Sequence, residues 1–151
     1  MTIRERMLQW EDLSAKDLVD IAFKSYMDVY KYIKERHLDF FHVVYGNEDG
    51  YIAFLIDLLK VSIAADGVLT ENEVILTQMI LKHISDTDYS ENDVYSLFKS
   101  VDRDSYKLVS NIGKGINDDQ VVGAMAAFLA SVAAIDGRVS EEEISFVESL
   151  C

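Results

Sequence analysis

Hydrophobic residues recur every three or four positions along most of the chain, which is the spacing of one face of an α-helix. The first clear case lies in residues 15–36, where Leu18 and Ala22 begin a series of apolar positions about one helical turn apart. Ser14 and Asp17 stand before that series at the spacing of a capping box, in which a hydroxyl and a carboxylate satisfy free N–H groups at a helix start. The pattern therefore predicts a helix over residues 15–36.

Spacing and caps predict further helices in the rest of the chain. Residues 51–65 are apolar on most sides, as in a central helix, and Ser90 with Asp93 repeats the capping pattern. The stretch HLDFFHVVYGNEDG, residues 37–50, fits either a helix end or a brief extended piece. Proline is absent, so no helix is interrupted by a missing donor. We expect an all-α bundle of six or seven helices, the later ones over residues 51–65, 71–85, 90–101, 104–113, 117–134 and 140–151.

An internal repeat divides most of the chain into two similar parts. The stretch AADGVLTENEV at residues 64–74 returns as AAIDGRVSEEEI at residues 133–144. Each copy places an apolar helix before an Asp-Gly turn and a capped acidic helix after it. The repeat predicts two pseudo-symmetric helical hairpins in a single domain over residues 1–151. Residues 1–45 are then expected to form an N-terminal helical extension packed on that domain.

The repeated acids have two physical interpretations. As helix caps, Glu73 and Glu143 complete capping boxes at the starts of the acidic helices. Asp66 and Asp136 fit this explanation less well, because an aspartate at the end of a helix faces the negative pole of the helix dipole. A hard divalent cation is the alternative explanation, since such ions prefer several carboxylate oxygens held close together.

An EF-hand is not the expected form of that cation site. The motif DGVLTENE matches the second half of an EF-hand loop, but Ser62 and Ala64 occupy the first and third ligand places, which need carboxylates. Val132 and Ala134 occupy the same places in the second copy. The acids of DTD and DRD, at residues 86–88 and 102–104, are interpreted as solvated turns.

The net charge of −13 indicates which classes of molecule the protein surface attracts and which it repels. Residues 46–151 hold 7 of the 14 basic and 19 of the 27 acidic side chains, so most of the negative charge lies there. Such a surface repels phosphate backbones, and direct binding of nucleic acid is therefore not expected. Cations and basic protein surfaces are attracted instead.

Other features give little sign of catalysis or export. His37, His42 and His83 are scattered and none belongs to a Glu-x-x-His pair, so the pattern of a di-iron bundle is missing. The single cysteine, Cys151, rules out an internal disulfide and fits a reducing compartment. The charged start MTIRERMLQWEDL does not match a signal peptide, and no apolar run reaches the length of a membrane span. We expect a cytoplasmic protein without a transmembrane segment.

The duplicated signature, an alanine-rich helix end followed by Asp-Gly, a hydrophobe, Thr or Ser and a Glu-rich helix start, resembles the tellurite-resistance TerB family over roughly residues 50–151. The resemblance implies an all-α bundle of two related halves. It also implies a metal-binding cluster formed by Asp66, Glu73, Asp136 and Glu143. Members of the family are linked to tellurite and other chemical stress and to phage defence, often as modules of larger assemblies.

Together these features predict a non-enzymatic, acidic, TerB-like binding module. Its expected ligands are a divalent metal ion of unspecified identity and a protein partner with a basic surface, and its expected setting is a stress-response or phage-defence assembly. Two alternatives stay open. One is a metal-dependent hydrolase that uses the duplicated Asp/Glu cluster to activate water. The other is a purely structural interaction domain whose Asp-Gly motifs only terminate helices.

Overall fold

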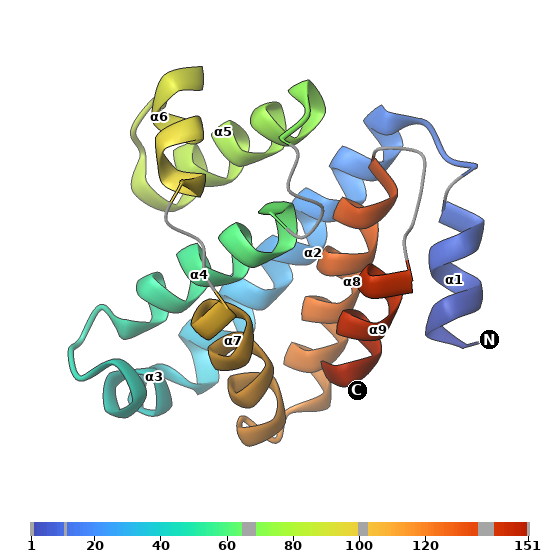
Figure 1. Cartoon of the computed structure of the whole chain (residues 1–151). Coiled ribbons are helices and arrows are strands. Elements are labelled where there is room, and N and C mark those ends of the chain that lie inside the picture. The colour runs from blue at the N-terminus through green and yellow to red at the C-terminus, as the bar shows by residue number, and fades with distance from the viewer. Residues whose placement is uncertain (1, 11, 65–68, 100–102, 136–140, 151) are drawn as a thin grey trace.

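A computed structural model describes residues 2–10, 12–64, 69–99, 103–135 and 141–150 (Figure 1). Within these residues all regular secondary structure is helical and no strand occurs, so the predicted all-α class is confirmed. The helices are α1 (Ile3–Trp10), α2 (Ala15–Arg36), α3 (Leu38–Tyr45), α4 (Gly50–Ala64), α5 (Glu71–Ser85), α6 (Glu91–Phe98), α7 (Arg103–Gly115), α8 (Asp119–Ile135) and α9 (Glu141–Leu150). None of the described helices is long and apolar enough to cross a membrane.

Helices α2 and α6 begin where the capping patterns predicted. The Ser14 hydroxyl accepts a hydrogen bond from the backbone N–H of Asp17 at 3.1 Å and thereby starts α2. The Ser90 and Asp93 side chains satisfy each other's backbone N–H groups at the start of α6, which is a complete capping box. Local side-chain chemistry therefore places these helix starts.

Two short helices, α1 and α3, make the chain richer in helices than the six or seven predicted. α3 resolves the ambiguous aromatic stretch as a helix, which ends at Gly46 in the left-handed conformation (φ 78°). α1 was not predicted because its sequence, IRERMLQW, is short and half polar. It packs across α8 and α9, where Met7 is fully buried.

The core forms where α2 and α8 pack along each other through the middle of the molecule (Figure 1). The rings of Tyr26 on α2 and Phe128 on α8 meet edge to face, with centroids 4.9 Å apart. The Tyr26 hydroxyl donates a hydrogen bond to the backbone carbonyl of Leu55 at 2.5 Å, which joins α4 to this pair. Thus α2, within the segment predicted as an extension, lies at the centre of the core.

The two predicted hairpins differ in their packing partners. α9 lies against α8 and α1, whereas α5 packs on α2 and α6. The predicted superposition of residues 54–80 on residues 124–150 runs through the Asp-Gly motifs, and residues 65–68 and 136–140 lie outside the described residues. The pseudo-symmetry therefore stays a prediction.

Candidate functional site

The four acids predicted to bind metal are described unequally. Asp66 and Asp136 lie outside the described residues. Glu143 belongs to α9, and its side chain is likewise outside what the structure describes. Glu73 alone is placed in full. The cluster of four carboxylates therefore stays a prediction.

Glu73 completes a capping box at the start of α5. Its Oε1 accepts hydrogen bonds from the backbone N–H of Thr70 at 3.0 Å and from the Thr70 hydroxyl at 2.9 Å. In return the Thr70 Oγ1 accepts a hydrogen bond from the Glu73 N–H at 3.3 Å. The residue is only 1% exposed. The capping interpretation of Glu73 is confirmed, and among the described residues no group of three His, Cys, Asp or Glu side chains is placed to hold a metal ion.

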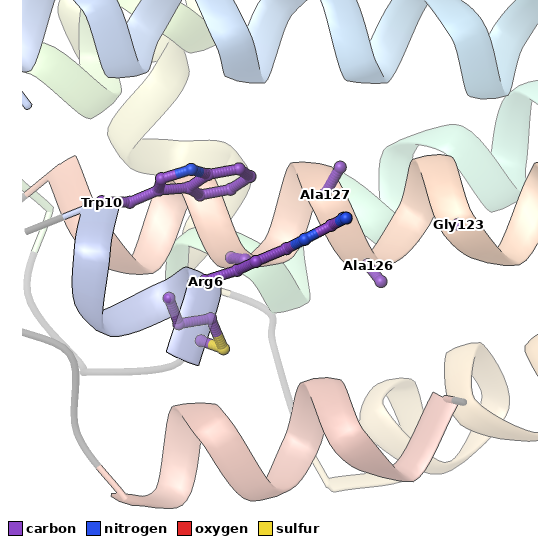
Figure 2. Close-up of a pocket in the computed structure, with 7 residues that line it drawn as sticks. Arg6, Trp10, Gly123, Ala126 and Ala127 are labelled. Carbon is purple, nitrogen blue, oxygen red and sulfur yellow. The ribbon is translucent and has the colours of Figure 1, made fainter. Parts of the chain in front are cut away.

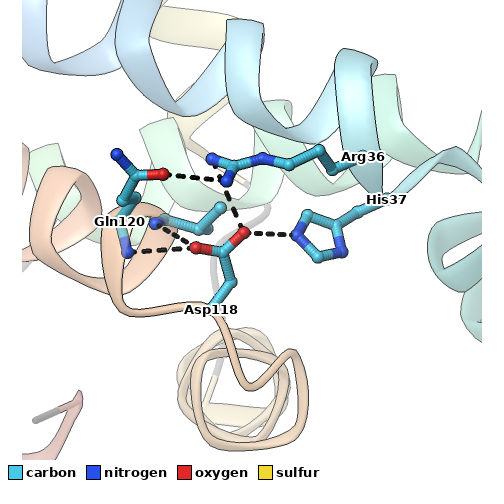
Figure 3. Close-up of polar contacts among 5 residues, drawn as sticks. Arg36, His37, Asp118 and Gln120 are labelled. Carbon is cyan, nitrogen blue, oxygen red and sulfur yellow. Dashed lines mark hydrogen bonds and ion pairs between the residues drawn. The ribbon is translucent and has the colours of Figure 1, made fainter.

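A polar cluster joins the end of α2 to the start of α8 (Figure 3). Asp118 caps α8, because its Oδ1 accepts hydrogen bonds from the N–H groups of Gln120 at 3.0 Å and Val121 at 3.3 Å. Its Oδ2 lies 2.6 Å from His37 Nε2 and 3.6 Å from a guanidinium nitrogen of Arg36. The cluster therefore caps a helix and ties together residues some 80 positions apart in the chain.

The contacts of Asp118 stabilise its charged form. The hydrogen bond from His37 lowers the pKa of the Asp118 carboxyl, with smaller contributions in the same direction from the two backbone N–H donors and Arg36. The guanidinium carbon of Arg36 lies 4.6 Å from the centroid of the Tyr32 ring, and Arg36 also donates a hydrogen bond to Gln120 Oε1 at 2.8 Å. Because the carboxylate is engaged on both oxygens, the cluster is a structural link.

Asp118→Ala is expected to lower the free energy of unfolding at pH 7 by about 1–2 kcal/mol, since it removes both the cap and the ion pairs. Asp118→Asn should lose less, because asparagine still caps the helix. The folded pKa of Asp118 lies below its ordinary value, so the carboxylate contributes stability above that ordinary value of about 4 and loses it as the pH falls through the folded pKa. Urea denaturation at several pH values checks this. A difference between wild type and Asp118→Asn that does not shrink below about pH 4 would contradict the assignment.

An apolar hollow of about 450 Å³ lies between α4, α5 and α6, and we call it the α4–α6 hollow. Ile56 of α4, Leu81 of α5 and Leu97 of α6 line it together with Tyr89, Asp93 and Ser96. Figure 1 shows α5 and α6 together at one end of the molecule. The Gln78 side chain donates a hydrogen bond to the Tyr89 carbonyl at 2.9 Å and so fixes the connecting loop against α5.

The segment beside this hollow is strongly acidic, and it consists of the loop before α6 and the first turn of α6; we call it the acidic loop. Residues 86–93 carry Asp86, Asp88, Glu91 and Asp93, and all four are exposed. Lys82 lies 3.6 Å from a carboxylate oxygen of Asp86 and 3.5 Å from one of Asp88, at positions where both aspartates remain almost fully in solvent. The interpretation of the DTD stretch as a solvated turn is confirmed. One lysine leaves the loop with excess negative charge next to an apolar surface, which suits a ligand that is both basic and apolar.

The α4–α6 hollow escaped prediction because no motif marks it. Its lining residues are ordinary core-type positions on separate helices, and only the packing of those helices leaves space between them. The run of acids in residues 86–93 was the one sequence feature that could have pointed to a binding surface here. Of the three histidines, His42 and His83 are exposed and His37 is half-buried.

Comparisons of the chain with protein-family models, with curated proteins and with solved structures found no match.

Proposed function

We propose that this protein is an acidic, TerB-like binding module that docks a basic, amphipathic segment of a partner protein in the α4–α6 hollow. The observation that carries the proposal is the position of the hollow directly beside the acidic loop of residues 86–93. An apolar side chain of the partner fills the hollow, and its lysines or arginines face the carboxylates. This is the helix-in-groove mode of recognition.

Two interactions contribute to the expected binding: burial of apolar surface and attraction between charges. Burial of apolar surface on Ile56 and Leu97 supplies most of the affinity, at about 25 cal/mol per Å² before the costs of association. The acidic loop accelerates encounter and selects against acidic partners. The net charge of −13 acts in the same direction over the whole surface. The TerB-like motifs favour a setting in a chemical-stress or phage-defence assembly.

A 14-residue amphipathic helix built from leucine and lysine is a direct probe of this site. We expect it to bind the wild-type protein in isothermal titration calorimetry, and to bind less tightly as salt is raised, because exposed charges are screened. The same peptide with glutamate in place of lysine should not bind. Asp88→Asn/Glu91→Gln should weaken binding by about fivefold, in line with the modest strength of exposed ion pairs.

Two matched controls keep this test specific. Asp39→Asn/Glu48→Gln removes the same amount of charge at exposed positions away from the hollow and should leave the affinity nearly unchanged. Ser96→Trp should block the hollow, whereas Ser145→Trp places the same side chain at an exposed position on α9 and should not. If both pairs of charge variants lose affinity equally, only the global charge attracts the peptide and the proposed site is wrong.

A divalent cation site of Asp66, Glu73, Asp136 and Glu143 is a second proposal. It is favoured by the repetition of an acidic motif directly after the ends of α4 at Ala64 and α8 at Ile135. A helix C-terminus is the negative pole of the helix dipole, so carboxylates placed just beyond it are stabilised by a bound positive charge. The buried Glu73 limits this proposal, because its Oε1 already accepts two hydrogen bonds.

Metal binding is expected to raise the melting temperature, since a ligand at 100 times its dissociation constant stabilises the folded state by about 2.7 kcal/mol. Thermal melts with millimolar calcium, magnesium, manganese or zinc measure this shift in melting temperature. The double variant Asp66→Asn/Asp136→Asn should show no shift, and in the presence of a chelator it should keep the helical content of the wild type. Unchanged melting curves with all four metals would rule the site out. Phosphoester turnover by the metal-loaded protein, lost in Asp66→Asn, would instead support the alternative of a metal-dependent hydrolase.

A further inference from the structure

A second apolar groove, of about 210 Å³, lies between α1 and α8 and is here called the α1–α8 groove (Figure 2). Met7 and Trp10 of α1 form one wall, and the surface of α8 forms the other. Figure 1 shows α1 on the opposite side of the molecule from α6, so the groove that α1 lines is separate from the α4–α6 hollow.

Small residues on α8 create this space. Gly123, Ala126, Ala127 and Ala130 recur at the three- and four-residue spacing of one helix face, and all four line the groove. A Cβ atom added at Gly123 would meet no atom within 4 Å. These short side chains leave space between α8 and α1 that larger residues would fill.

Arg6 gives the groove a positive charge. Figure 2 shows its side chain extending from α1 toward Ala127, on the same side of α8 as the Trp10 ring. The neighbouring Arg4 is neutralised by Glu141, at 2.7 Å, and by Glu148, at 3.7 Å. Arg6, in contrast, forms no ion pair with any residue that the structure describes. A guanidinium beside an apolar wall matches an anion with an apolar tail. Its fork geometry pairs with carboxylates and phosphates, and the carboxylate is the smaller of the two head groups.

We propose that the α1–α8 groove binds a small aliphatic carboxylate, with its chain over Gly123 and Ala127 and its head group on Arg6. The volume favours a small molecule, because a cavity of about 150 Å³ already accepts benzene and a packed helix requires about 8–10 Å between helix axes. A chain of about eight carbons is a suitable length, on the basis that apolar ligands gain from each buried methylene. This site does not depend on the proposed docking of a basic partner.

Octanoate, used below the concentration at which it forms micelles, is the probe. Trp10 is the only tryptophan of the chain, so its fluorescence reports occupancy of the groove. We expect a saturable change in Trp10 emission with octanoate, and no comparable change with octylammonium. Arg6→Gln should weaken octanoate binding about tenfold or more, as expected for loss of a charge-assisted hydrogen bond. Lys24→Gln, which removes an exposed charge on α2, should bind as the wild type does.

Gly123→Leu and Ala127→Leu each fill the groove and should abolish the response, while circular dichroism melts confirm that the variants are folded. The proposal is overturned if octanoate gives no saturable response. It is equally overturned if octanol and octanoate bind alike, because Arg6 then plays no part, or if both folded leucine variants bind as the wild type does.

Discussion

Replacing Gly50 with alanine is expected to destabilise the protein by about 2–3 kcal/mol, because α3 and α4 meet at this residue without room for a side chain. An alanine Cβ at Gly50 would clash with the backbone carbonyl oxygen of Phe41 and would lie 2.9 Å from the Cβ of Tyr45. Neither atom is the end of a flexible side chain, so one helix must move. That movement would disturb the contact of the Phe41 and Phe54 rings, whose centroids are 4.7 Å apart. Urea denaturation of wild type and variant measures the loss.

Gly123→Ala is the matched control for Gly50→Ala. Gly123 lies inside α8 with open space around the position of its Cβ. Alanine there should stabilise the protein by up to about 1 kcal/mol, because glycine is a poor helix former. If Gly50→Ala were as stable as the wild type, the close approach of α3 to α4 would be wrong.

Phe128→Ala is expected to lower the free energy of unfolding by about 3–5 kcal/mol, since it leaves a cavity at the centre of the core. Phe128 is fully buried, and its ring packs against Tyr26 between α8 and α2. The measurement is chemical denaturation, with Phe128→Leu as a milder variant that should lose less. Phe98→Ala makes the same chemical change at a partly buried position on α6 and should cost clearly less. Equal losses at both positions would contradict the central packing of α2 on α8.

Local sequence chemistry was sufficient to predict most of the helices. The start of α5 is the clearest example, because Thr70 and Glu73 form the predicted capping box within four residues. The aromatic stretch before Gly46 remained ambiguous, since its apolar residues fit a short helix or an extended piece equally well. α1 was missed because its stability depends on packing against α8 and α9, and an isolated octapeptide that is half polar does not indicate that contact.

Contacts between segments far apart in the chain could not be predicted from sequence patterns. His37 and Asp118 lie 81 positions apart, and nothing in the spacing of either residue indicates that their side chains meet. The α4–α6 hollow and the α1–α8 groove likewise depend on how the helices pack. Neither could be predicted, because the sequence pattern of their lining residues is that of ordinary core or surface positions. Local capping explained Glu73, but whether the two acidic motifs approach each other depends on tertiary structure.

The central claim, docking of a basic amphipathic segment in the α4–α6 hollow, is tested most directly by mapping where such a segment binds. The measurement is a titration of ¹⁵N-labelled protein with the leucine–lysine peptide, followed through backbone amide chemical shifts. We predict that the shifts concentrate on Ile56, Leu81 and residues 88–97, and that Ser96→Trp removes them. Shifts spread evenly over the acidic surface, or centred on residues 65–68 and 136–140, would contradict docking in the hollow.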